Sequence, residues 1–183
     1  MHWNLFSVLE SDLSMVSRYI EFDERNFDTF SPELSKLLLS AGSEVDVIFK
    51  HMCARVDASA PRRNILDYYK VINSNSKLKL MLTEEIFIPR FGLSFKPFAE
   101  WSDEKRPDWW QAYNNVKHDR RNSYHQASLQ SVLMSLSALM LCVLYLEKHL
   151  KPKMQVKEIT SKLLPESQLL RFKDEYYYSR VVI

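Results

Sequence analysis

Apolar residues along this chain recur mostly at steps of three and four, the spacing of one face of an α-helix. Residues 5–20 show this pattern first. The segment "SPEL" then begins a second predicted helix, which continues to residue 56. Ser31 is suited to cap this helix and Pro32 to occupy its first turn. The segment "RRNILDYYKVIN" predicts a shorter third helix that ends near "NSNS".

The spacing changes in residues 80–98, where apolar and polar residues alternate as they do in a β-strand. Gly92 lies near the middle of this segment, with Pro89 and Pro97 at its edges. We therefore expect a small two-stranded ribbon or an extended flap near residues 84–97. The apolar residues that carry the alternation are Ile86, Ile88, Phe91, Leu93 and Phe95.

Helical spacing returns in the second half of the chain. We predict a helix over residues 107–118 and a long one from near residue 123 to residue 150, ended by Pro152. The segment "VKEITSKLL" predicts a short helix, and "YYYSRVVI" (176–183) has a strand-like composition. The sequence therefore predicts an all-α fold. We expect a bundle of about five helices in one domain over residues 1–183.

The segment "ASLQSVLMSLSALMLCVLYL" (127–146) is apolar over about the length of a bilayer span. Gln130 and several serines lower its hydropathy, and basic residues flank both ends. We therefore favour a buried core helix over a membrane span. Its small residues form one stripe that lets a second helix approach closely, either the second helix of this chain or a symmetry mate. They are Ser128, Ser131, Ser135, Ala138 and Cys142.

Composition narrows the functional class. The formal net charge is only +2, so no global field favours nucleic acid or an anionic membrane. Only two glycines occur, which argues against a glycine-rich phosphate loop. Cys53 and Cys142 are isolated in apolar helical patterns, which predicts core residues in a reducing compartment. We expect a cytoplasmic protein without a secretory signal, a cofactor, a structural metal or a membrane partner.

The densest group of chemically capable side chains is "KHDRRNSYH" (117–125), directly before the long helix. Lys117, Arg120 and Arg121 are cations, and His118 and His125 can titrate near neutral pH. The free N–H groups of a helix N-terminus favour an anion, so we expect a phosphate site here. Histidine can move a proton and arginine can stabilise phosphoryl charge, which together serve cleavage by a ribose 2′-hydroxyl.

Neighbouring residues extend this candidate site. Asn114 and Lys117 lie beside the buried face of the preceding predicted helix. Tyr113 and Tyr124 can wall the site or stack on a base. On a continuous helix, Arg121 and His125 would share one face.

A helical chain with R-x4-H at the entrance to a long apolar helix resembles the HEPN superfamily, with Arg120 and His125 as the matching pair. The resemblance implies a dimerising helical bundle whose paired motifs cleave RNA without a metal, often in toxin–antitoxin or antiviral defence systems. Other members only bind. Arg120 would stabilise the phosphate and His125 would transfer the proton. Arg121 departs from the asparagine common at that position. In a "YNNVKHDR" variant of the motif, His118 and Arg120 would be the important pair.

Two other interpretations stay open. The cations can pair with Glu44 or Asp46 on the second helix and simply join helices. The protein would then be a non-catalytic, dimeric interaction module that binds an antitoxin or another protein. A metal site at His118, Asp119 and His125 is disfavoured, because no further ligand is well placed.

Overall fold

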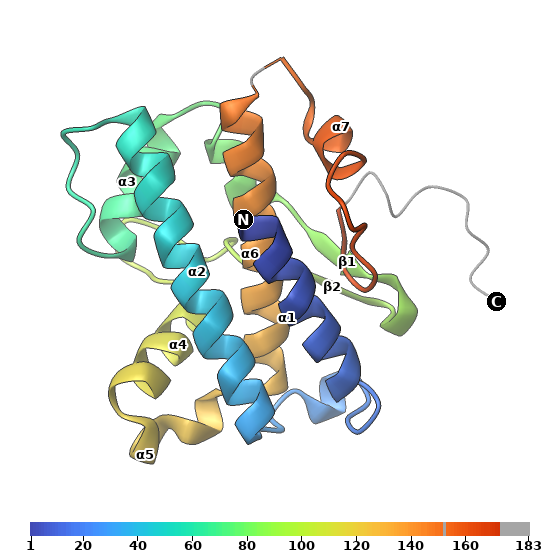
Figure 1. Ribbon diagram of the computed structural model, residues 1–183. Coiled ribbons are helices and arrows are strands. Elements are labelled where there is room, and N and C mark those ends of the chain that lie inside the picture. Colours follow the sequence, from blue (N-terminus) through green and yellow to red (C-terminus); the bar gives the residue numbers. More distant parts are fainter. Residues whose placement is uncertain (152, 173–183) are drawn as a thin grey trace.

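The computed structural model describes residues 1–151 and 153–172. These residues form seven α-helices and one small sheet, which confirms the predicted all-α bundle with a β-ribbon. The four helices that form the centre of the bundle are α1 (His2–Val16), α2 (Pro32–Val56), α4 (Asp108–His118) and α6 (Leu129–Leu150) (Figure 1). Shorter helices lie around them: α3 (Ile65–Ser74), α5 (Arg120–Ser123) and α7 (Val156–Thr160).

Helix α6 is the core of the bundle. It contacts α2 most extensively, and also α1, α4 and α7. Among the described residues it is the one helix long and apolar enough to cross a membrane, yet 83% of its most apolar window is buried inside the protein. Ser135, Ala138 and Cys142 from the predicted small-residue stripe are fully buried within the chain, so they are not available to a symmetry mate.

Local signals determine where α2 begins. The Ser31 hydroxyl accepts a hydrogen bond from the Leu34 amide at 3.2 Å, and Pro32 occupies the first turn, as predicted. Farther along α2, Gly42 allows α4 to approach closely. A Cβ atom at this position would lie 2.5 Å from the ring of Tyr113, which is almost completely buried.

The ribbon consists of β1 (Ile86–Ile88) and β2 (Leu93–Phe95), which pair antiparallel with Ile86 opposite Phe95. Gly92 has φ +66° at the turn between them, a conformation that favours glycine. A third strand, β3 (Arg171–Phe172), pairs with the other edge of β1 and was not predicted. The predicted strand over residues 176–183 lies outside the described residues.

A buried carboxylate connects the last described segment to α1. Glu10 is only 2% exposed and accepts hydrogen bonds from the amides of residues 168–170 at 2.8–2.9 Å and from the Ser167 hydroxyl. The Trp3 indole N–H donates to the Pro165 carbonyl at 2.9 Å. Residues 165–170 are therefore held against the first helix.

Both cysteines are small core residues, as predicted. Cys53 and Cys142 are buried free thiols. Burial raises the pKa of Cys53 to about 12 and that of Cys142 well above its ordinary value. Neither thiol is therefore positioned as a nucleophile.

Candidate functional site

The polar segment 117–125 lies at one end of the bundle, at the lower left of Figure 1, where α4 ends and α5 begins. Asp119 separates the two helices, and a 3₁₀ turn over Tyr124–Gln126 follows α5. The prediction that the long helix begins near residue 123 is therefore wrong. Helix α6 begins at Leu129, because extended backbone at Ser128 pairs with Phe30 and the Ser128 hydroxyl caps the helix.

The N-terminus of α6 does not offer the free amides that we expected for an anion. The Leu129 amide donates to the Thr29 carbonyl at 2.8 Å, and the Gln130 amide donates to the Phe27 carbonyl at 3.1 Å. The Ser131 amide donates to the Ser128 hydroxyl. These three amides are therefore not available to an anion, because they are already satisfied by the loop before α2 and by Ser128. The predicted phosphate site at residues 117–125 stays a prediction that rests on its side chains.

Side-chain hydrogen bonds hold the α4–α5 connection in place. The carboxylate of Asp119 accepts from the Asn122 side-chain amide at 2.9 Å and from its backbone N–H at 3.4 Å. Asn115 on α4 donates to the Gln126 side chain at 2.8 Å. Asp119 thus caps α5, and among the described residues its carboxylate forms no ion pair with a neighbouring cation.

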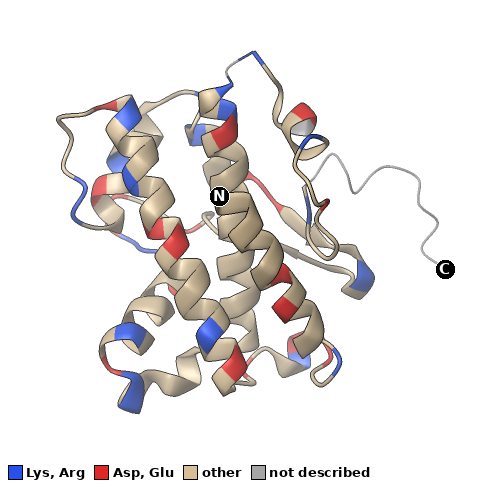
Figure 2. Ribbon diagram, viewed as in Figure 1, with Lys and Arg blue, Asp and Glu red and all other residues tan. Residues whose placement is uncertain are grey.

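The predicted cations and imidazoles form an exposed group, which we call the basic surface. It consists of Lys117, His118, Arg120, Arg121 and His125, all exposed. Figure 2 shows blue Lys and Arg positions at this α4–α5 end of the bundle, at the lower left. Among the described residues, none of the five forms an ion pair with a carboxylate. Lys117 instead contacts Tyr113, with its Nζ 3.3 Å from the hydroxyl and 5.4 Å from the ring centroid.

The proposed pairing of these cations with α2 is wrong. Glu44 Oε1 lies 2.5 Å from Nδ1 of His2 on α1. Asp46 accepts from the Lys50 ammonium at 2.5 Å and from the Tyr68 hydroxyl at 2.8 Å. Both carboxylates are therefore engaged by other groups, which leaves the basic surface facing solvent.

Two predicted binding residues have packing roles. Tyr113 is 3% exposed and lies against Gly42, so its ring faces are not available to a base. Asn114 donates to the Trp110 carbonyl of its own helix at 2.9 Å. The continuous helix on which Arg121 and His125 would share one face does not form, because α5 ends at Ser123 before His125.

Tyr124 is half-buried and has an aromatic neighbour that the sequence did not indicate. Its ring centroid lies 5.5 Å from that of Phe30, at an interplanar angle of 83°. Phe30 comes from the loop before α2, far from Tyr124 in the sequence. Its position follows from the same pairing with Ser128 that sets the start of α6.

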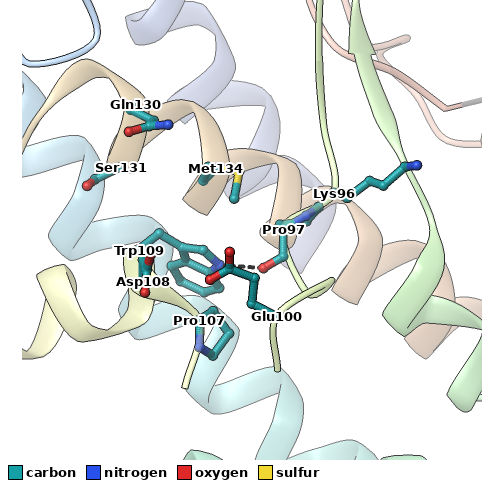
Figure 3. A pocket seen from close by; sticks show the side chains of 9 residues that line it. All are labelled: Lys96, Pro97, Glu100, Pro107, Asp108, Trp109, Gln130, Ser131 and Met134. Atoms are coloured by element: carbon teal, nitrogen blue, oxygen red, sulfur yellow. Dashed lines mark hydrogen bonds between the residues drawn. The ribbon is translucent and has the colours of Figure 1, made fainter. Parts of the chain in front are cut away.

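A separate cavity of about 160 Å³ lies between residues 96–109 and the first turns of α6 (Figure 3). Glu100 and Asp108 line it together with Trp109, whose indole N–H donates to the Pro97 carbonyl at 2.8 Å. None of the predicted site residues lines this cavity. Among the described residues, no group of three or more His, Cys, Asp or Glu side chains is placed to hold a metal ion.

Comparisons with protein-family models, with curated proteins and with solved structures gave no match to this chain. The resemblance to the HEPN superfamily therefore stays a prediction based on Arg120, His125 and the helical bundle.

Proposed function

We propose that the basic surface binds the phosphates of RNA and cleaves the chain without a metal. The observation that carries this proposal is the group of five exposed cations and imidazoles that lack a carboxylate partner among the described residues. Unpaired surface cations in one place are the electrostatic requirement for phosphate binding. The R-x4-H spacing adds a proton-transfer group beside them. A role in a defence or toxin–antitoxin system would follow from the resemblance.

The chemistry requires little beyond these side chains. His125 accepts the proton of a ribose 2′-hydroxyl, and the 2′-oxygen forms a bond to phosphorus. The bond from phosphorus to the 5′-oxygen breaks, and that oxygen takes a proton from a second acid, for which His118 is the candidate. Arg120 stabilises the charge that develops on the phosphoryl oxygens. The products are a 2′,3′-cyclic phosphate and a 5′-hydroxyl end.

The test is cleavage of a labelled RNA by the purified protein in EDTA. We expect Arg120→Ala and His125→Ala each to lower the cleavage rate by about 100-fold or more, because each removes a group that acts in the transition state. Arg55→Ala and His51→Ala are matched controls, since both residues are exposed on α2 and outside the basic surface. Equal rates for the site variants and these controls would contradict the proposal.

A second candidate is a dimeric interaction module, and a feature of α1 favours it. Val8 and Met15 are 57% and 54% exposed and lie seven residues apart, on one face of α1. Tyr19, in the turn after this helix, is 82% exposed. A groove of about 520 Å³ lies beside Met15 and Tyr19, between α1 and α2. Exposed apolar patches of this kind mark interaction sites.

Charge favours a second copy of this chain as the occupant of that face. Asp12 and Arg18 are exposed, and neither has an ion-pair partner among the described residues. Both are three residues from Met15. In an antiparallel contact with its two-fold axis at Met15, Asp12 of each copy therefore lies opposite Arg18 of the other.

A further inference from the structure

Phe30 is an exposed aromatic side chain with a fixed position. It is 48% exposed, although a ring of this size is usually buried. Its backbone pairs with Ser128, and the neighbouring Thr29 carbonyl accepts from the Leu129 amide at 2.8 Å. The edge-to-face contact with Tyr124 holds the ring from the side. Phe30 is thus exposed to solvent on a backbone that is hydrogen-bonded to the segment that begins α6.

This aromatic pair lies at the edge of the basic surface. Tyr124 follows Arg120 and Arg121 by one helical turn and directly precedes His125. Proteins that bind single-stranded nucleic acid combine cations that contact the backbone with aromatic rings on which bases stack. Both components meet here. A duplex hides its base faces in the helical stack, so a ring beside the cations gains contacts only from an unpaired base.

We propose that Phe30 and Tyr124 form a stacking platform for an unpaired base, so that the substrate of the basic surface is single-stranded RNA. This inference rests on the proposed function and adds a residue and a substrate class to it. The cations would bind phosphates of any RNA. The platform would discriminate between single strands and duplexes.

The experiment measures binding of the full chain to a labelled single-stranded oligonucleotide and to a duplex of the same length, by fluorescence anisotropy in EDTA at fixed salt. We expect Phe30→Ala to weaken single-strand binding roughly 5- to 100-fold and to leave duplex binding unchanged. Phe30→Leu keeps apolar volume without a ring and should weaken single-strand binding to a similar extent. Phe30→Tyr keeps the ring and should bind like the wild type. Tyr19→Ala is the matched control, because it removes an exposed aromatic ring from the turn after α1.

The outcomes distinguish failure of the stacking platform from failure of the basic surface as an RNA site. Wild-type affinity in Phe30→Leu would overturn the platform, and so would an equal loss for single strand and duplex. If a Phe30 variant fails to fold, Tyr124→Leu tests the same platform from the other side of the contact, in the 3₁₀ turn that follows α5. Unchanged RNA binding when Arg120 and Arg121 are both replaced by alanine would instead overturn the basic surface as an RNA site. If the Phe30 variants overturn the platform but RNA binding still depends on Arg120 and Arg121, only the platform is rejected and the proposed function is not.

Discussion

At the scale of single residues, the contact between Gly42 and Tyr113 determines how closely α2 and α4 pack. An alanine in a helix interior normally adds about 0.5–1 kcal/mol of stability over glycine. At position 42 the added Cβ would lie 2.5 Å from the Tyr113 ring. We therefore expect Gly42→Ala to lower the free energy of unfolding by about 1–3 kcal/mol, measured by urea denaturation.

Ser43→Ala is the control for this substitution, because Ser43 is exposed on the same helix and its replacement should change stability by less than about 0.5 kcal/mol. In a Tyr113→Ala background the penalty of Gly42→Ala should disappear, since the ring that causes the clash is gone. A Gly42→Ala protein more stable than the wild type would show that α4 moves away at little cost.

At the scale of elements, the segment 165–170 depends on the Glu10 carboxylate. In Glu10→Gln an amide nitrogen replaces one acceptor oxygen, so a donor would face the backbone N–H groups of this segment. We expect a loss of about 1.5–3 kcal/mol, the range for hydrogen bonds to a charged group. Hydrogen exchange of the amides of residues 168–170 should become faster. Glu33→Gln is the matched control, because Glu33 is exposed and pairs only with Lys36 among the described residues. Unchanged protection of these amides would contradict the prediction.

Element boundaries show what the sequence could and could not predict. The start of α2 was predictable because its signals, Ser31 and Pro32, are local. The start of α6 was not, since it depends on Phe30 and on carbonyl groups about 100 residues earlier in the chain. Strand β3 was not predicted for the same reason, because a strand of two residues exists only through its pairing with β1.

The candidate site also has features that could be predicted from the sequence and features that could not. Its cations could be identified from the sequence because they are concentrated in one polar segment. Their lack of carboxylate partners could not, because Glu44 contacts His2, which is 42 residues away in the chain. Phe30 was missed because a single aromatic residue in a loop carries no periodicity or spacing that indicates its neighbours.

At the scale of the whole molecule, the exposed face of α1 predicts self-association. Light scattering on the eluting protein should give twice the 21.7 kDa chain mass. Met15→Glu should give the single-chain mass, because it places two carboxylates at the centre of the contact. Leu80→Glu is the control, since Leu80 is also exposed but lies on a different element.

The charge pair adds a second criterion. Asp12→Arg alone should weaken the dimer through repulsion from Arg18, and Arg18→Asp in the same chain should restore it. A wild-type protein with the single-chain mass would overturn this arrangement, as would a dimer that Met15→Glu leaves intact.

The contact between Glu10 and residues 167–170 also has a consequence for synthesis. Glu10 precedes Leu170 by 160 residues. At about 5–20 residues per second, a ribosome needs roughly 10–30 s to make the intervening chain. Throughout that time, the first helix carries a carboxylate that is intended for burial but has none of its four donors. The Glu10 carboxylate must therefore stay hydrated, or α1 must be bound by a chaperone, until residues 167–170 have been translated.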